Sequence, residues 1–293
     1  MLAPLYICGS TATGKSSVAL HLAQALNGEI INADAYQIYQ GIETIAANPS
    51  DEDLSQVTHH LYSHLPLTTE LNAAKYKALA DPIIEDVISR GKVPLITGGS
   101  GMYLKFLTHG PSPIPASDPT VRATLDAREL PDLIEELRSL DPEVLDTFPP
   151  ENKRYVIRAL EICLMTGQKA STLKSDWERL PNPAPQGILV APSKEETLLS
   201  IEARTDAMLS NGAIEEVAGL PENMPTAGKA IGIREIQNYL SGEWTLEECR
   251  ERLIISTRQY AKRQRNWFRG ETWLKPFHPT ERDAITQYAQ SLS

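Results

Sequence analysis

A glycine-rich loop near the start of the chain restricts its fold more than any other feature. Residues 9–17, GSTATGKSS, lie between the apolar run LYIC and the helical pattern VALHLAQAL. Within them, Gly9, Gly14, Lys15 and Ser16 match G-x-x-x-x-G-K-[ST], the phosphate-binding loop that joins a strand to a helix. Backbone N–H groups and the helix N-terminus form a concave anion site there. The sequence therefore predicts a phosphate site, and the alternative is a turn that only resembles one.

The whole loop is expected to hold phosphate groups. Lys15 supplies a positive charge, and the Ser16 hydroxyl is the usual Mg²⁺ ligand in such loops. Mg²⁺ is therefore the expected cofactor, with Ser16 as its protein ligand. The expected phosphate-binding residues are Gly9, Ser10, Thr11, Ala12, Thr13, Gly14, Lys15 and Ser16.

Short apolar runs alternate with helical patterns over the first hundred residues. Strands are expected at 5–8, 29–34 and 92–97, and a fourth at 187–193. This alternation indicates an α/β fold, with a P-loop NTPase-like parallel sheet flanked by helices. Further helices are expected at 194–211, 232–240 and 245–268.

Two proline-rich stretches border a different region. PSPIPASDP covers residues 111–119 and LPNPAPQ covers 180–186, and every periodic segment between them has helical spacing. We expect an all-helical insertion domain at 113–185, within a core made of 1–112 and 186–293.

The composition is that of an ordinary globular protein. Of 293 residues, 41% are hydrophobic and 23% are charged. The start MLAPLYICGS has no basic region before a long apolar core, and no stretch approaches 18 apolar residues, so neither a signal peptide nor a membrane span is expected. The three cysteines form no zinc pattern or disulfide framework. These features favour a cytoplasmic location.

One basic segment departs from the acidic average. The net charge is −10, yet residues 250–269 contain seven basic residues and one acidic residue. Here TRQYAKRQRNWF places cations in one helical stripe among aromatic residues, which suits RNA phosphates and unpaired bases. The alternative is a solvated helix face, with Tyr260 and Trp267 in the core. The candidate RNA-binding residues are Arg258, Lys262, Arg263 and Arg265.

Asp34 is the candidate catalytic carboxylate. A nucleotide hydrolase or kinase needs an acid after a second strand to position Mg²⁺, but PLIT and GILV both end without one. Asp34 alone ends a strand, at the sheet edge where open α/β proteins build their sites. Beside it, Gln37 and Tyr39 suit contact with a nucleobase. Taken alone, Asp34 could equally be a helix N-cap.

A second glycine turn, GGSGMY at 98–103, also joins a strand to a helix. Ser100 and the neighbouring amides could bind a second phosphate from the opposite side. The motif is weak by itself, and its value lies in sharing the strand-end placement of the first loop.

These segments, in this order, resemble the tRNA dimethylallyltransferase family. The resemblance covers nearly the whole chain, and its last segment is the most specific. The matching segments are GSTATGKS, DAYQIYQG, THHL at 58–61, GGSGMYL, RALEICLMTGQ at 158–168, ARTDAMLSNGAIEEV at 203–217, AIGIREI at 230–236 and TRQYAKRQRNWF.

The resemblance implies a reaction. The family transfers a dimethylallyl group from dimethylallyl diphosphate to N6 of the adenosine next to the tRNA anticodon. The phosphate loop would then hold the diphosphate of the donor, so no acid that positions a hydrolytic water is needed. By resemblance, Asp34 is the general base, and Ser100 and Arg204 act on the leaving diphosphate.

The resemblance also assigns contacts with tRNA. The insertion would clasp the anticodon stem-loop, with Arg154 and Arg158 facing RNA unless they pair with Glu151 or Glu161. Gln37 would form a hydrogen bond with the extruded base, and Tyr39 would lie beside that base. A monomer is expected, because the RNA itself would fill the cleft.

Several positions depart from the family pattern. Ala35 stands in place of Ser, Ser100 in place of Thr, and Ile233 in place of Tyr. Ala46 and Asn48 replace Thr and Lys in a loop that lies near tRNA in the family. The zinc finger of eukaryotic members is absent, since no paired Cys or His pattern occurs.

Three other functions remain open. The chain could prenylate free adenine nucleotides, although an insertion and a basic aromatic helix favour tRNA. It could be a P-loop kinase in which Asp34 binds a substrate hydroxyl. It could also be a non-catalytic RNA-binding protein, which the presence of Lys15, Ser16 and Asp34 disfavours.

Overall fold

The computed structural model describes residues 3–179, 181 and 183–292. Its internal contacts divide the chain into two compact units. The first comprises Met1–Leu107 and Ala184–Ser293, and the second is Thr108–Pro183. The expected insertion, 113–185, begins five residues after the second unit begins and ends two residues after it ends.

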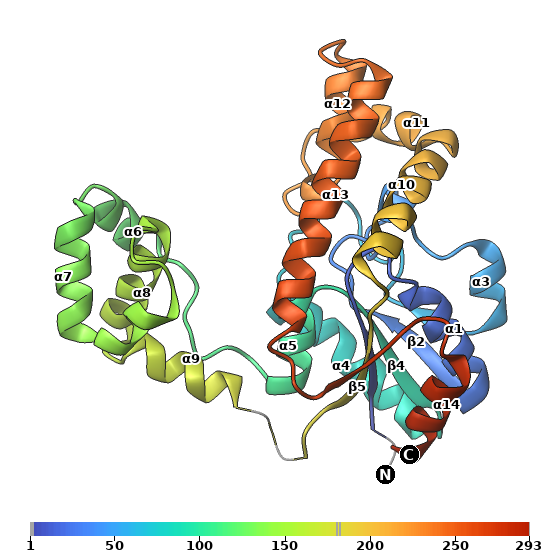
Figure 1. Cartoon of the computed structure of the whole chain (residues 1–293), viewed down its shortest axis with the longest axis horizontal. Coiled ribbons are helices and arrows are strands. Elements are labelled where there is room, and N and C mark those ends of the chain that lie inside the picture. Colours follow the sequence, from blue (N-terminus) through green and yellow to red (C-terminus); the bar gives the residue numbers. More distant parts are fainter. Residues whose placement is uncertain (1–2, 180, 182, 293) are drawn as a thin grey trace. The chain divides into compact units, whose positions relative to one another are not determined.

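A single six-stranded sheet forms the centre of the first unit (Figure 1). The strand order is β3-β2-β4-β1-β5-β6, and every neighbouring pair is parallel. The predicted parallel α/β sheet is therefore confirmed. The strands are β1 (Leu5–Cys8), β2 (Gly28–Asn32), β3 (His59–His60), β4 (Val93–Gly98), β5 (Gln186–Val190) and β6 (Leu274–Phe277).

Alternating side chains of the strands enter two separate cores. In β1, Leu5 and Ile7 pack with residues of α1 and α14 on one face, whereas Tyr6 and Cys8 belong to the core on the other face. Both faces are covered, which is why the strands are nearly continuous apolar runs. The helices of this unit are α1 (Lys15–Leu26), α2 (Glu43–Ala46), α3 (Asp51–Gln56), α4 (Ala73–Ser89), α5 (Gly101–His109), α10 (Lys194–Ser210), α11 (Ala213–Ala218), α12 (Ile233–Leu240), α13 (Leu246–Phe268) and α14 (Arg282–Ser291).

A buried carboxylate in β2 is hydrogen-bonded to three basic side chains. The Glu29 side chain is 1% exposed and accepts hydrogen bonds from Arg90 at 2.5 and 2.7 Å, from Lys92 at 2.7 Å, and from the His60 ring at 2.8 Å. Hydrogen bonding from Arg90, reinforced by Lys92 and His60, outweighs burial and holds the pKa of Glu29 well below its ordinary value. Glu29 therefore contributes to folding as an ionised group.

The second unit is helical throughout the residues described. Leu133 and Leu137 of α7 pack against Val156 and Leu160 of α8 in a core separate from those of the sheet. The helical spacing predicted between the two proline-rich stretches is observed in the described residues of this unit. Its elements are α6 (Pro119–Asp126), α7 (Leu130–Leu140), a 3₁₀ turn (Pro142–Thr147), α8 (Lys153–Thr166) and α9 (Ala170–Glu178).

Two strands were missed by the sequence analysis. β3 has only two residues, and β6 lies at the sheet edge, after the last expected helix, where no strand was predicted. The strand expected at 29–34 ends at Asn32, so Asp34 lies two residues beyond it. No helix in the described part of the chain has the length and apolar character needed to cross a membrane.

Candidate active site

The phosphate-binding loop connects β1 to α1, as its sequence predicts. Gly14 has a φ of 84°, in the left-handed region that favours glycine. At Gly9, a Cβ atom would lie 2.7 Å from the carbonyl oxygen of Val190 in β5, so a larger residue would displace the loop from the neighbouring strand. Both motif glycines are thus required by the geometry of the loop.

Lys15 lies at the start of α1 and is folded back on the loop. Its Nζ donates to the carbonyl oxygen of Ser10 at 2.7 Å, and Thr13 Oγ1 donates to the same oxygen at 2.9 Å. Burial lowers the pKa of Lys15 to about 8, although the Asp34 carboxylate partly offsets this shift. A bound anion would restore the preference of Lys15 for its charged form.

Two cavities meet at this loop. The larger, about 290 Å³, is lined by loop residues 11–17, Asp34, Gln37, Thr97 and Arg204, among others. The smaller, about 60 Å³, combines Tyr36, Thr257 and Tyr260 with an apolar wall. We call them the phosphate cavity and the inner cavity. The apolar wall of the inner cavity includes Ile45, Ile201, Met208 and Ile231.

Four residues line both cavities: Thr11, Asp34, Ala46 and Arg204. Asp34 is the one carboxylate among the described residues that line either cavity. A group held in the phosphate cavity and a group held in the inner cavity would therefore meet beside Asp34 and Arg204.

Local hydrogen bonds fix the position of Asp34. Its Oδ1 accepts from the Tyr36 backbone N–H at 3.0 Å, and its own N–H donates to Asn32 Oδ1 at 2.8 Å. Asp34 lies between β2 and α2 and caps neither, so the helix N-cap alternative does not hold for these elements. The carboxylate retains lone pairs that can accept a proton.

Arg204 extends from α10 to the loop. Its Nη1 donates to Thr11 Oγ1 at 3.2 Å and its Nη2 donates to the carbonyl oxygen of Ala46 at 3.1 Å. Burial lowers the pKa of Arg204 and the Asp34 carboxylate raises it, but guanidinium groups stay protonated in proteins. Arg204 therefore presents a fixed positive charge to both cavities.

The IPP transferase family model matches residues 37–271. The chain belongs to this family. The predicted family resemblance is thus confirmed. The tRNA dimethylallyltransferase of Akkermansia muciniphila is 38% identical, over 98% of this chain and 97% of the relative. That of Geobacter sulfurreducens is 36% identical, over 97% and 94%.

Solved structures of the family share this fold. A tRNA isopentenylpyrophosphate transferase from Staphylococcus epidermidis has a TM-score of 0.70 at 29% identity, covering 99% of this chain and all of that one. A eukaryotic dimethylallyltransferase acting on tRNA has a TM-score of 0.78 at 25% identity, covering all of this chain and 77% of that one.

Ser100 is placed differently from the expectation for a phosphate ligand. It lines neither of the two cavities. Its Oγ accepts the Ala35 backbone N–H at 2.9 Å, and it is hydrogen-bonded to the Tyr260 hydroxyl. Ser100 therefore supports the segment that carries Asp34.

Gln264 is a site residue that the sequence analysis missed. It is 5% exposed on α13, accepts the Thr11 backbone N–H on Oε1 at 2.7 Å, and donates from Nε2 to the Gly99 carbonyl at 2.9 Å. A Cβ at Gly99 would lie 2.3 Å from that Nε2. Gln264 thus clamps the phosphate loop to the second glycine turn. The available signal was its spacing from Ala261 and Phe268, on the buried face of the helix.

Oxygen ligands at the phosphate cavity fit a magnesium ion that arrives with a diphosphate. Ser16 is exposed and lines the cavity, and the buried Oγ1 of Thr97 has no hydrogen-bond partner among the described residues. Those residues contain no cluster of three or more His, Cys, Asp or Glu side chains that could hold a metal. In phosphate-binding loops the Ser or Thr hydroxyl ligates Mg²⁺, and substrate phosphates and water supply further ligands.

The predicted RNA-contact residues have different environments. On α13, Arg258, Lys262 and Arg263 are exposed and Arg265 is half-buried. Arg263 lies 5.7 Å from the centre of the Tyr260 ring. Tyr260 and Trp267 are half-buried, and Trp267 packs on the core around the sheet, as the alternative interpretation of these aromatic residues expected.

Two of those predictions need correction. Tyr39 is fully buried and its hydroxyl donates to the Thr69 carbonyl, so it is a core residue. On α8, Arg158 donates to the buried carboxylate of Glu161 at 2.6 Å, which is the ion pair considered as the alternative. Arg154 is exposed on the same helix.

Gln37 lines the phosphate cavity, but its amide is already engaged. Its Nε2 donates to the Ala47 carbonyl at 2.7 Å and, more weakly, to that of Ala46 at 3.3 Å. Asn48 also holds this loop, because its Nδ2 donates to the Gln37 carbonyl at 3.1 Å and to Ser63 Oγ at 2.9 Å.

Proposed function

We propose that this chain transfers the dimethylallyl group of dimethylallyl diphosphate to N6 of the adenosine 3′-adjacent to a tRNA anticodon, with release of diphosphate. The observation that carries the proposal is the pair of cavities that meet at Asp34 and Arg204. The names of the relatives support the same reaction. A donor in one cavity and an acceptor in the other would react at their junction.

The diphosphate of the donor binds in the phosphate cavity. Loop amides and Lys15 contact its oxygens, and Ser16 would hold the Mg²⁺ ion that accompanies it. When bound, such an ion would supply positive charge that offsets the charge of the leaving diphosphate. Thr97, whose Oγ1 is unpartnered among the described residues, is the second protein oxygen available to that ion or its water.

The acceptor adenine enters the inner cavity, after it leaves the stack of the RNA loop at a cost of a few kcal/mol. N6 attacks C1 of the prenyl group, the C1–O bond breaks, and the electron pair leaves on the diphosphate. Asp34 accepts the proton that N6 gives up, and Arg204 stabilises the negative charge that develops on the leaving oxygen. The apolar wall excludes water from the prenyl carbon.

The exposed cations of α13 and Arg154 of α8 contact the RNA backbone. Three cations of α13 are exposed, so they can bind phosphate oxygens without first leaving the protein interior. They are Arg258, Lys262 and Arg263. This charge favours a polynucleotide acceptor over a free adenine nucleotide.

The structure offers less support for a kinase. β4, the strand beside β1, ends with Thr97 and Gly98 and brings no acid to the phosphate cavity. A P-loop kinase or hydrolase uses an acid from a second strand to position the metal ion. A prenyl transfer breaks a C–O bond and not a P–O bond, so it needs no acid that positions a metal ion for attack on phosphorus.

One assay separates these functions. The protein is incubated with labelled dimethylallyl diphosphate, Mg²⁺ and either tRNA lacking the modification or AMP. Label in tRNA is the expected result. Label in AMP alone would support the nucleotide prenyltransferase, and label in neither acceptor would overturn both transferase functions.

A further inference from the structure

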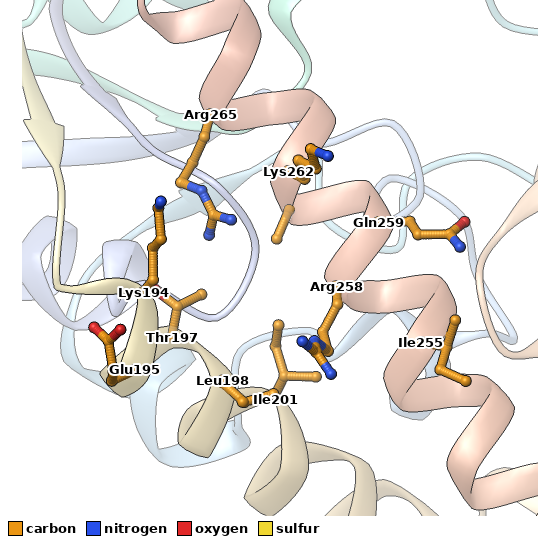
Figure 2. A pocket seen from close by; sticks show the side chains of 11 residues that line it. Lys194, Glu195, Thr197, Leu198, Ile201, Ile255, Arg258, Gln259, Lys262 and Arg265 are labelled. Atoms are coloured by element: carbon orange, nitrogen blue, oxygen red, sulfur yellow. The ribbon is translucent and has the colours of Figure 1, made fainter.

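A third cavity lies between α10 and α13, beyond the two cavities of the candidate active site (Figure 2). Its volume is about 420 Å³, larger than either of the others and within the range of roughly 300–1,000 Å³ typical of small-molecule sites. Ile201 lines both this cavity and the inner cavity, so the two adjoin. We call it the α10–α13 groove.

Four cations and one acid border the groove. Lys194 comes from α10, and Arg258, Lys262 and Arg265 come from α13. Figure 2 shows Lys194 and Arg265 directed towards each other across the gap. The acid is Glu195, beside Lys194 on α10.

These cations have no internal counterion. Within the part of the chain that the structure describes, none of the four has a carboxylate within ion-pairing distance. Like charges that converge without a shared anion repel one another. Arg250, eight residues before Arg258 and so about two turns nearer the N-terminus of α13, instead pairs with Asp206 of α10 at 2.6 Å. The groove therefore lacks a carboxylate like that of Asp206, which forms an ion pair between the same two helices at Arg250.

The floor of the groove is apolar. Leu198 and Ile201 of α10 face Ile255 and Ala261 of α13. Phosphate alone would leave this surface and most of the volume unfilled. The groove thus suits a ligand that has both an anionic part and a flat or apolar part of moderate size.

We propose that the α10–α13 groove binds a second unpaired nucleotide of the substrate RNA, next to the acceptor adenosine. Its base lies on the apolar floor, and its flanking phosphates pair with Lys194, Arg258 and Arg265. This inference rests on the proposed function, because it assumes an RNA acceptor whose target base enters the adjoining inner cavity.

The test uses an anticodon stem-loop RNA in which single loop nucleotides are replaced by abasic ones. Binding to the intact wild-type protein is measured by fluorescence anisotropy, without the prenyl donor. A base on this floor buries apolar surface at about 25 cal/mol per Å², so its loss over on the order of 60 Å² corresponds to roughly 10-fold in Kd. We expect one abasic position beside the acceptor to weaken binding by such a factor.

Leu198→Trp fills the floor of the groove, and Leu199→Trp is its matched control. Leu199 is on the same helix, 65% exposed, and does not line the groove. We expect Leu198→Trp to bind the unmodified loop as weakly as wild type binds the abasic loop, and to show no further loss with the abasic RNA. Leu199→Trp is expected to behave as wild type. Donor affinity without RNA should remain unchanged in both variants.

Three outcomes overturn the groove assignment. In the first, abasic replacement weakens binding only at the acceptor position. In the second, abasic replacement beside the acceptor weakens RNA binding by the same factor in Leu198→Trp and in wild type. Alternatively, Leu198→Trp could weaken binding of dimethylallyl diphosphate or inorganic diphosphate alone, which would make the groove a site for the donor or product. Failure of the proposed function would give a different result. The protein would then bind RNA with the expected abasic dependence but would transfer no prenyl group.

Discussion

Asp34 and Arg204 lie side by side at the junction of two cavities but have different tasks. Asp34 keeps a carboxylate with free lone pairs between β2 and α2. Arg204 is half-buried and already hydrogen-bonded to the phosphate loop. A proton acceptor and a fixed cation are thus available at one point, as a displacement of diphosphate by an amine requires.

Asp34→Ala should abolish most of the turnover while RNA binding persists. A positioned general base contributes roughly 10²- to 10⁴-fold, so single-turnover prenyl transfer should fall by that factor. Anisotropy with the stem-loop RNA provides the binding control. Transfer at the wild-type rate in this variant would remove Asp34 from the role of base.

Donor capture should weaken at alkaline pH. Because burial lowers the pKa of Lys15 to about 8, the free enzyme loses this positive charge as the pH rises through 8. The kcat/KM for dimethylallyl diphosphate, which reports on groups of the free enzyme, should therefore decline above that pH. Lys15→Arg retains its charge and should shift the decline to higher pH. An identical profile in both proteins would assign the titration to another group.

At the level of secondary structure elements, α13 does more than present cations. Gln264 connects it to the phosphate loop through Thr11 and to the second glycine turn through Gly99. The Trp267 ring occupies the space beside Gly101, where a Cβ would lie 2.4 Å from the ring. The helix is therefore held against both glycine turns along its buried face.

Gln264→Leu should weaken donor binding more than RNA binding. The change leaves the Thr11 N–H and the Gly99 carbonyl without partners, at about 1–3 kcal/mol for each buried group. Titration calorimetry with dimethylallyl diphosphate should then show a higher Kd, while the anisotropy of the RNA complex stays close to wild type. Equal losses for both ligands would point to a general disturbance of α13.

Helix α8 offers a matched pair of arginines. Arg154 is exposed, whereas Arg158 pairs with the buried Glu161. We expect Arg154→Ala to reduce RNA affinity and its salt dependence, with unchanged thermal stability. Arg158→Ala should lower the melting temperature and leave the salt dependence unaltered. A reversal of these two patterns would move the RNA contact to Arg158.

The elements differed in how well their sequence predicted them. Long periodic segments such as α10 and α13, and apolar runs such as β1, were located closely because one local pattern covers their whole length. β6, with the sequence LKPF, exposes Lys275 and Pro276 at the sheet edge, so it lacks the alternation typical of a strand.

Side-chain partners were predicted less well than elements. The phosphate loop and Asp34 were found because motif and strand-end position are local properties. Gln264 contacts a residue 253 positions away, and the burial of Tyr39 depends on packing around the sheet. Neither relation has a local sequence signal strong enough to identify a partner.

At the scale of the whole molecule, stability depends on buried charge as well as on the apolar cores. Glu29 is enclosed by three basic side chains at the start of β2. Its low pKa makes its contribution to the free energy of unfolding dependent on pH.

The protein should lose stability in acid through Glu29. An unfolded Glu has a pKa of about 4.3, so the contribution is complete above that value and declines as the pH falls towards the lower pKa of the folded state. Glu29→Gln should lower the free energy of unfolding at pH 7 by about 1.5–3 kcal/mol and flatten its decline below pH 4. Urea unfolding at several pH values measures both effects. A parallel decline in both proteins would assign the acid sensitivity to other carboxylates.

The contacts of Gln264 can couple the binding of the two proposed substrates, the prenyl donor and the RNA. The helix that carries the proposed RNA-binding cations is hydrogen-bonded directly to the loop that would hold the donor. Linkage between two binding sites is reciprocal, so any factor by which bound donor strengthens RNA binding through this contact must equally strengthen donor binding when RNA is bound. Cooperativity measured from either ligand would therefore yield the same number, and its loss in Gln264→Leu would locate the connection.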